Sequence, residues 1–465
     1  MKSKPTSLPV MLSLIFWIVS PAMYAQTCIQ DFAPKPPLGF NSFDSYRTYL
    51  SEDKAYALMD VMAEKYRPFG YEYFVIDAGW ARNVELYPGT MYPTRRLGVA
   101  MDEFGLLEPC EMYFPNGIKA LTDYAHKKGL KFGVWIMRGI PRQAVEQNLP
   151  IKGSPYFAKE IVDTNSVCVW NQDNYGIDMT KPGAQAYYNA LIDKLASWGI
   201  DFIKVDDIVP NPQEIVAVAK AIEDGGHHMI YSLSPGDVHH PAHLAYYRRA
   251  NMLRITRDIW DNPLSLEKGF FAWEKFQGTE RPGFWPDLDM IPFGRLDVVA
   301  TDNIPNIPPD RRARQSRFNQ DQMKTFMTQR ALAASPLIIG GDLLTMDDFS
   351  YNLLTNREML ACNQNGVMGI NVYRAGNINV WLTPHKRNPG AGWIGIFNRS
   401  KTNRKVTLNK QDLGFVAFEA SYNLTAARQR FQLKDIWSHE TITIEDKHTF
   451  TLPAEGVAFL KFQMQ

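Results

Sequence analysis

The feature that most limits the fold is a series of eight short apolar segments, each followed by a stretch whose apolar residues have helical spacing. Strands buried on both faces of a parallel sheet read as nearly continuous apolar runs, as these do. Eight strands, each followed by a helix, make a closed (β/α)8 barrel, and we expect one over residues 34–366. The segments lie at 36–43, 71–80, 130–137, 201–207, 228–235, 251–259, 282–290 and 335–343.

The pattern changes after about residue 366. Short segments of alternating polarity follow, such as INVWLTPH and GWIGIFNRS, and Gly, Asn and Pro separate them. This pattern predicts a C-terminal antiparallel β-sandwich over residues 367–465. Two long segments, about 81–108 and 303–318, fit neither pattern, and we expect them to form loops over the active face of the barrel.

The N-terminus has the three parts of a secretory signal peptide. The chain starts with a basic segment (MKSKPTS), which is followed by an apolar stretch (LPVMLSLIFWIV). Small residues then precede a predicted cleavage site after Ala25. The stretch is too short for a stable membrane span, and no later segment is long and apolar enough to cross a bilayer. We expect residues 1–25 to be removed and the mature protein to be secreted or periplasmic. A lipid anchor at Cys28 is the less favoured alternative.

Charge and cysteine content exclude some classes of partner. Lysine plus arginine number 50 and aspartate plus glutamate 49, so the balance favours no nucleic-acid partner. None of the four cysteines has zinc-ligand spacing, and we expect one disulfide or buried free thiols. We expect no metal and no cofactor.

Polar side chains recur at the ends of the predicted strands. Residues two apart on a strand share a face, so Lys204 and Asp206 lie together and Asp207 turns away or begins the loop. The same rule groups Arg254 with Thr256 and Asp258. It also groups Gly133 with Trp135 and Met137, and Trp285 with Asp287 and Asp289. All four sets fall at the C-terminal ends of strands, where barrel enzymes build their sites.

Two carboxylates that converge on one pocket suit glycoside hydrolysis. Asp206 is the candidate nucleophile, because the neighbouring cation of Lys204 favours its ionised form. Asp258 is the candidate acid/base and needs surroundings with fewer cations. We therefore expect Arg254 to donate to substrate hydroxyls rather than to pair with Asp258. The other interpretations are a salt bridge at the barrel rim for Lys204 and Asp206, a capping role for Asp77 in the segment that follows it, and a core position for Trp285.

Eight motifs in order resemble glycoside hydrolase family 27, the α-galactosidases and α-N-acetylgalactosaminidases. The resemblance covers about residues 34–366 and fits the sandwich as well. It implies a retaining exo-glycosidase that acts on oligosaccharides or polysaccharides, with its two carboxyl groups about 5–5.5 Å apart. The motifs are PPLGFNSF, YFVIDAGW, FPNGIKALTDYAHKKGLKFGVW, FIKVDD, RITRDIW, WPDLDM, ASPLIIGGDL and NREMLACNQ.

The resemblance also implies roles for individual residues. Asp206 matches the family's nucleophile and Asp258 its acid/base. The sugar-hydroxyl contacts match Asp77, Lys204, Arg254 and Asp289, and the aromatic walls match Phe40, Trp80 and Trp135.

Three departures from the family pattern concern the sugar. The family has two adjacent aspartates where this chain has Asp77 and Ala78, so one of the two carboxylates that bind the galactose 4- and 6-hydroxyls is missing. Trp135 replaces a tyrosine. Ser234 stands where α-galactosidases often have glutamate, and a small residue there leaves room at the sugar's 2-position. The leading prediction is an α-galactosidase; α-N-acetylgalactosamine, β-L-arabinopyranose and α-glucose units are the alternative substrates.

Two further classes of function are alternatives. A carbohydrate-binding barrel without activity needs the loss of a catalytic carboxylate, and both Asp206 and Asp258 are present. A metal-dependent hydrolase needs ligands, and five histidines are available, but their spacing matches no standard zinc motif. They are His227, His228, His239, His240 and His243.

Overall fold

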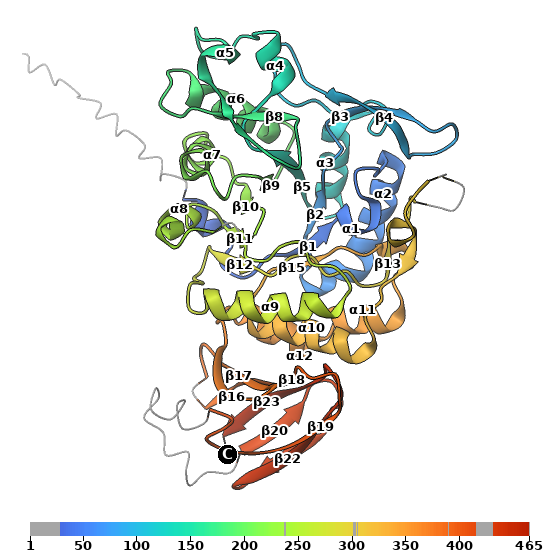
Figure 1. Cartoon of the computed structure of the whole chain (residues 1–465), viewed down its shortest axis with the longest axis vertical. Helices are drawn as coiled ribbons and strands as arrows, with labels where there is room; N and C mark the ends of the chain where they lie inside the picture. Colours follow the sequence, from blue (N-terminus) through green and yellow to red (C-terminus); the bar gives the residue numbers. More distant parts are fainter. Residues whose placement is uncertain are drawn as a thin grey trace, which may run out of the picture.

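The computed structural model describes residues 28–236, 239–300, 304, 306–388, 390–414 and 431–464. The predicted signal peptide lies outside this range. Figure 1 shows a large barrel and a smaller β-sheet domain, with a layer of helices between them. No helix in the described part of the chain combines the length and the apolar character that a bilayer span requires. The four cysteines are free thiols: Cys28 is exposed, and Cys110, Cys168 and Cys362 are buried.

A parallel sheet of eight strands forms the barrel, and the strands follow one another in chain order. Figure 1 looks along the barrel, so the strand labels form a ring. A parallel bridge between Ile291 and Ile339 joins the two ends of the sheet. Each strand lies within one of the eight apolar runs, which confirms the predicted (β/α)8 fold. The strands are β1 (Leu38–Asn41), β2 (Tyr73–Ile76), β5 (Lys131–Met137), β9 (Phe202–Asp206), β10 (Ile230–Leu233), β11 (Met252–Arg254), β12 (Trp285–Asp287) and β15 (Leu337–Ile339).

Helices surround the barrel, and local sequence signals set their ends. The side chain of Asn262 accepts a hydrogen bond from the Ser265 backbone and begins α9, and Asn319 begins α10 in the same way. Gly199, which follows α6, has a φ of 84°, a conformation that costs glycine little. The main helices are α2 (Glu52–Val61), α3 (Gly117–Lys127), α6 (Ala184–Ser197), α7 (Pro212–Asp224), α8 (Leu244–Tyr247), α9 (Pro263–Phe276), α10 (Gln320–Leu332), α11 (Asp348–Leu354) and α12 (Arg357–Gln364).

Insertions after the strands build the rim of the barrel. The first predicted loop contains an antiparallel hairpin of β3 (Arg82–Leu86) and β4 (Pro93–Val99). The chain after β5 forms α4 (Arg142–Glu146), α5 (Ala158–Ile161) and a small sheet of β6 (Ile140–Pro141), β7 (Val162–Val167) and β8 (Asn174–Ile177). The described part of the second predicted loop contains β14 (Arg314–Gln315), which pairs with β13 (Arg295–Leu296).

The C-terminal domain has two antiparallel sheets, as the alternating pattern predicts. One sheet has the order β16-β17-β18-β23-β20-β21, and β19 pairs with β22 in the other. Apolar side chains such as Val380, Ile394 and Phe462 form a separate core between them. The strands are β16 (Ile370–Ala375), β17 (Ile378–Pro384), β18 (Ala391–Asn398), β19 (Arg404–Asn409), β20 (Phe431–Asp435), β21 (Thr441–Ile444), β22 (Lys447–Leu452) and β23 (Val457–Met464).

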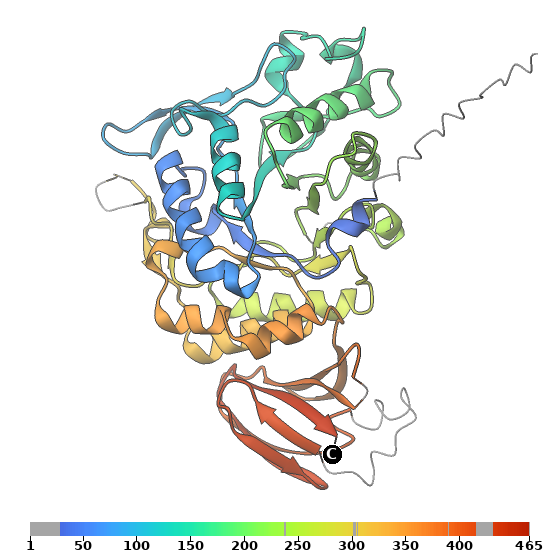
Figure 2. The ribbon, with the colours of Figure 1, turned by 180° about the vertical axis from the view of Figure 1, so that it is seen from behind.

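Aromatic contacts attach this domain to the helical layer of the barrel. Trp273 of α9 stacks on Trp381 of β17 with ring centroids 3.7 Å apart, and Phe270 meets Phe397 edge-on. Figures 1 and 2 show the domain beside α9 and α10 from both sides. The sandwich therefore supports the barrel from its helical layer.

Candidate active site

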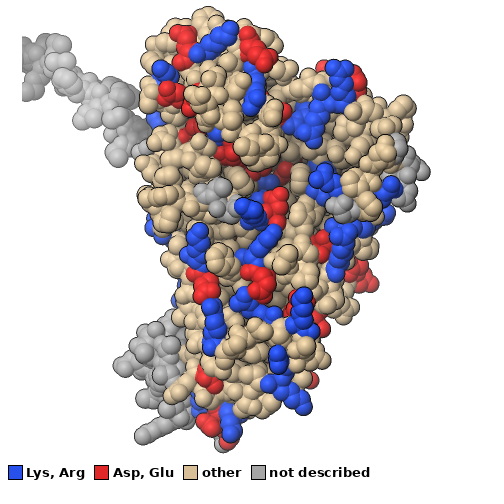
Figure 3. Space-filling model, viewed as in Figure 1, with Lys and Arg blue, Asp and Glu red and all other residues tan. Residues whose placement is uncertain are grey.

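A cavity of about 760 Å³ lies at the C-terminal ends of the barrel strands. Asp206 and Asp258 both line it, together with Asp77, Lys204 and Arg254. Figure 3 shows a hollow in the middle of the face seen in Figure 1, where acidic and basic side chains lie together. The predicted convergence of charged groups on one mouth of the barrel therefore exists.

Asp206 ends β9 and has two oxygens in different situations. The indole N–H of Trp135 donates to its Oδ2 atom over 2.7 Å. Its Oδ1 atom is buried and has no hydrogen-bond partner among the described residues. One oxygen is thus held in place, and the other keeps its lone pairs, which is the state that a nucleophilic carboxylate needs.

Lys204 lies two residues earlier on the same face of β9. Its Nζ atom donates to Oδ2 of Asp77 over 2.9 Å, and Asn41 donates to the same oxygen over 2.7 Å. Burial lowers the pKa of Lys204, but the carboxylates of Asp77 and Asp206 raise it by more, so the net shift is upward. Lys204 is therefore a fixed cation between two carboxylates.

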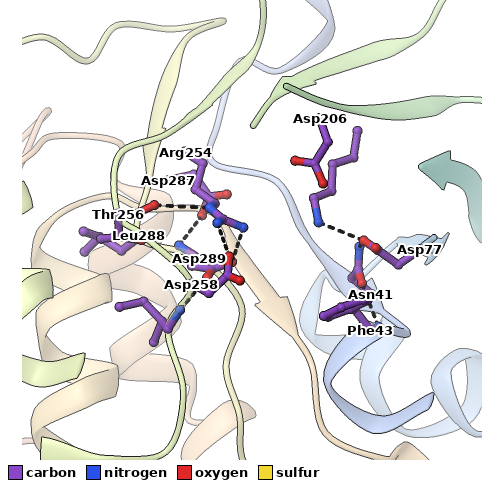
Figure 4. Close-up of polar contacts among 12 residues, drawn as sticks. Asn41, Phe43, Asp77, Asp206, Arg254, Thr256, Asp258, Asp287, Leu288 and Asp289 are labelled. Carbon is purple, nitrogen blue, oxygen red and sulfur yellow. Dashed lines mark hydrogen bonds and ion pairs between the residues drawn. The ribbon is translucent and has the colours of Figure 1, made fainter. Parts of the chain in front are cut away.

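A second charged group comes from β11 and β12. Arg254, which is buried, forms an ion pair with Asp258 and a longer one, 3.4 Å, with Asp289. The second carboxylate oxygen of Asp289 accepts the backbone N–H of Ile259 over 2.8 Å, which fixes the loop that carries Asp258. Figure 4 shows this group facing the one formed by Asp77 and Asp206.

The contact of Arg254 with Asp258 differs from the sequence expectation. The Asp258 side chain is 68% exposed to the cavity, whereas that of Arg254 is only 7% exposed. Partial loss of water around Asp258 in the cavity raises its pKa, but the charge and hydrogen bond of Arg254 lower the pKa more, and the net shift is downward. In the ligand-free protein Asp258 is therefore ionised, and its proton must be acquired when substrate changes these contacts.

Asp207 begins a loop, as expected. Its φ of 61° takes it out of the strand alternation, and its carboxylate pairs with Arg138 at 2.9 Å. Burial raises the pKa of Asp207, which Arg138 partly offsets. Asp207 therefore anchors the end of β9.

The structure corrects four of the predicted contacts. Phe40 is fully buried and packs on Phe74 in the helix-facing core, because its neighbour Asn41 takes the inward direction. Trp285 begins β12 and is fully buried, and its indole donates to the Ala33 carbonyl over 2.8 Å, outside the cavity lining. Trp285 is therefore part of the core at the other end of the barrel.

The other two corrections concern Trp80 and Ser234. Trp80 is buried, meets Trp198 edge-on and donates to the backbone carbonyl of Trp135 over 2.6 Å. It supports the strand that carries Trp135 and does not line the cavity. Ser234 is buried in a small space inside the barrel, beside Lys204 and Arg254 and outside the cavity lining.

Sequence reasoning also missed residues that line the cavity. Phe43 follows β1 and takes the wall position that Phe40 does not, and the same motif carries it. Asp44 is buried beside it with one oxygen unpartnered among the described residues, and burial raises the pKa of its carboxyl. Trp170 and Trp260 lie in loops, where strand alternation gives no signal.

The predicted histidine cluster has structural contacts. His239 bonds the Arg254 carbonyl over 2.7 Å, and His240 accepts the Ala242 N–H over 3.3 Å. Within the described ranges, no group of three or more His, Cys, Asp or Glu side chains is arranged to hold a metal ion.

Known structures contain the same barrel and sandwich. A glycoside hydrolase family 27 β-L-arabinopyranosidase of Geobacillus stearothermophilus, solved as a variant with arabinose, is 35% identical to this chain. The match has a TM-score of 0.84 and covers 95% of this chain and 99% of that one. The chain belongs to glycoside hydrolase family 27. It is therefore a glycosidase.

Two plant enzymes are less similar in sequence to this chain than the arabinopyranosidase is. α-Galactosidase 2 of Arabidopsis thaliana is 26% identical over 90% of this chain and 87% of its own length. The α-galactosidase of Coffea arabica is 27% identical over 87% of both.

Family models describe each domain separately. Residues 375–462 match the α-galactosidase C-terminal β-sandwich domain. Residues 31–272 match the TIM-barrel domain of glycosyl hydrolases family 31. The second match spans only part of the barrel, whereas the family 27 relative matches both domains, so the family 27 assignment takes precedence.

Proposed function

We propose that this family 27 enzyme is a retaining exo-glycosidase for terminal sugars with the ring configuration of α-D-galactopyranose. Among these, we propose β-L-arabinopyranose, which is this ring without its C6 hydroxymethyl group, as the better substrate. The observation that carries the proposal is the single carboxylate of Asp77 beside the apolar Ala78 at the cavity wall.

In the first step Asp206 attacks the anomeric carbon with its unpartnered Oδ1 atom while Trp135 holds Oδ2. The bond to the leaving oxygen breaks, and Asp258 supplies the proton. In the second step Asp258 takes a proton from water, which displaces Asp206 and restores the original anomeric configuration. The separation of 5–5.5 Å between the two carboxyl groups stays a prediction.

The acid role of Asp258 requires that Arg254 lose its present contact. The positive charges of Arg254 and Lys204 interact electrostatically with both catalytic carboxylates. A sugar hydroxyl that accepts from Arg254 competes with Asp258 for the guanidinium, and the burial of Asp258 by substrate raises its pKa. Substrate binding itself therefore prepares Asp258 to hold a proton.

The sugar preference follows from the wall near Asp77. Its Oδ1 atom already accepts the Ala78 N–H over 2.8 Å, and Oδ2 is shared by Asn41 and Lys204. Ala78 packs with Trp135, Met137 and Cys168, which form an apolar surface. A primary hydroxyl that lies against this surface loses water contacts without replacement, whereas arabinopyranose has no such hydroxyl.

An α-galactosidase is the second candidate, favoured by the curated plant relatives. Ser234 lies in the small space beside Lys204 and Arg254, and activity on N-acetylgalactosamine stays an alternative. We also propose export from the cytoplasm on the basis of the predicted signal peptide.

The test is a panel of p-nitrophenyl glycosides of β-L-arabinopyranose, α-D-galactose, α-N-acetylgalactosamine and α-D-glucose. We expect the highest kcat/KM on the arabinopyranoside and measurable turnover of the galactoside, with retention of configuration by NMR. A higher kcat/KM on the galactoside favours the second candidate. Hydrolysis of neither, or inversion, refutes the proposal.

A further inference from the structure

An exposed apolar turn lies at the mouth of the cavity and has no part in the chemistry described so far. Val169 is 90% exposed and Trp170 54%, and both line the cavity that contains Asp206 and Asp258. Large exposed apolar side chains in one place usually mark a binding surface. The turn connects β7 with β8, in the insertion that follows β5.

The turn is held by polar contacts. The Cys168 thiol lies in hydrogen-bond range of the Asp207 carboxylate and of the backbone N–H groups of Trp170 and Asn171. Asp173, after the turn, forms an ion pair with Arg82 of the β3–β4 hairpin. Contacts with Asp207, the residue next to Asp206, and with the β3–β4 hairpin thus hold the backbone of the turn that presents the exposed Trp170 ring to the cavity.

The cavity has room for more than one sugar ring. Its 760 Å³ correspond to roughly 25 water molecules, about twice the number of non-hydrogen atoms in a pentose or hexose. The inner end holds the catalytic carboxylates. The remaining volume therefore surrounds the leaving group of a substrate whose terminal sugar occupies the inner end.

We propose that Trp170 forms the binding site for the saccharide leaving group. The apolar C–H face of a pyranose ring packs on an indole face, as other apolar groups do. Asn171 and Arg96 also line the cavity and supply hydrogen bonds to the sugar's hydroxyls. Arg96 is exposed on β4. This inference rests on the proposed function and adds to it the residue that binds the leaving group.

The test compares a substrate whose leaving group is a saccharide with one whose leaving group is a single fluoride ion. The pair is a β-L-arabinopyranosyl disaccharide and β-L-arabinopyranosyl fluoride, or melibiose and α-D-galactosyl fluoride if the aryl panel favours galactose. Trp170→Ala should lower kcat/KM on the disaccharide about tenfold and leave the fluoride within about twofold, because one aromatic contact is worth up to about a factor of ten. Trp170→Phe should retain most of the disaccharide activity.

Phe157→Ala is the matched control. Phe157 is 42% exposed in the same insertion but lies outside the cavity lining, so neither substrate should be affected. Equal losses on both substrates for Trp170→Ala, or no loss on the disaccharide, overturn the inference. Hydrolysis of the fluoride by the wild type checks the proposed function separately.

Discussion

The substitution Ala78→Asp tests the proposed origin of sugar preference. Ala78 is partly exposed to the cavity, and its backbone N–H is bonded to Asp77, so a longer side chain at this position extends into the space beside that carboxylate. A carboxylate there provides the second charged acceptor that the family pattern contains and this chain lacks. It is expected to bind the hydroxyls that distinguish galactose from arabinopyranose.

A hydrogen bond to a charged group is worth about 1.5–3 kcal/mol, which is roughly 10-fold to 150-fold in kcat/KM. The new carboxylate is repelled by Asp77, and the apolar surface of Trp135, Met137 and Cys168 disfavours its charge. We therefore expect the lower end, about a tenfold rise in the ratio of galactoside to arabinopyranoside kcat/KM.

The assay measures both p-nitrophenyl glycosides with each variant. Ala78→Asn is the matched control, because it has the size of aspartate without the charge, and we expect a rise of only about threefold from a neutral hydrogen bond. A ratio that stays constant in an Ala78→Asp protein with normal arabinopyranoside activity refutes the reasoning.

Three further predictions concern the carboxyl groups of the barrel. Asp206→Gly should lose turnover but fold normally, and azide should restore activity by forming a glycosyl azide of inverted configuration; the absence of that product by NMR counts against Asp206 as nucleophile. Asp258→Asn should slow substrates with poor leaving groups far more than activated aryl glycosides, and equal losses contradict its acid role. Burial raises the pKa of Asp287 from 3.8 to about 7, so ionising it destabilises the folded protein increasingly as the pH rises from about 4 to about 7, and by a constant amount above. Asn at this position keeps the acceptor for the Asp289 N–H. The melting temperature of Asp287→Asn minus that of the wild type should therefore increase as the pH rises across that range. A difference that does not depend on pH refutes this assignment.

Strand alternation correctly placed Lys204 and Asp206 on one face of β9, where both line the cavity. Lys204 and Asp206 share a face because the side-chain period of a strand is two, whatever surrounds the strand. This relation is local, so the sequence contains it. The hydrogen bond from Trp135 to Asp206 depends instead on the register of β5 against β9, which pairs Trp135 with Lys204 and Met137 with Asp206.

Alternation gives the face of a side chain but not its height along the barrel. Trp285 lies in the core at the start of β12, whereas Asp289 follows the end of that strand with a φ of 72° and lines the cavity. Phe40 is fully buried, and Phe43 of the same motif lines the cavity instead.

The sequence by itself determined the order of the eight strands and the change to a sandwich, because these depend on local patterns. It also identified the two carboxylates, Asp206 at the end of β9 and Asp258 in the loop after β11. The tertiary structure decided which charges pair: Arg254 holds Asp258 because β12 and its loop bring Asp289 and Ile259 together around them. It also decided that Trp170 lies at the cavity, since a turn has no periodicity and only its contacts with Asp207 and the β3–β4 hairpin place it there.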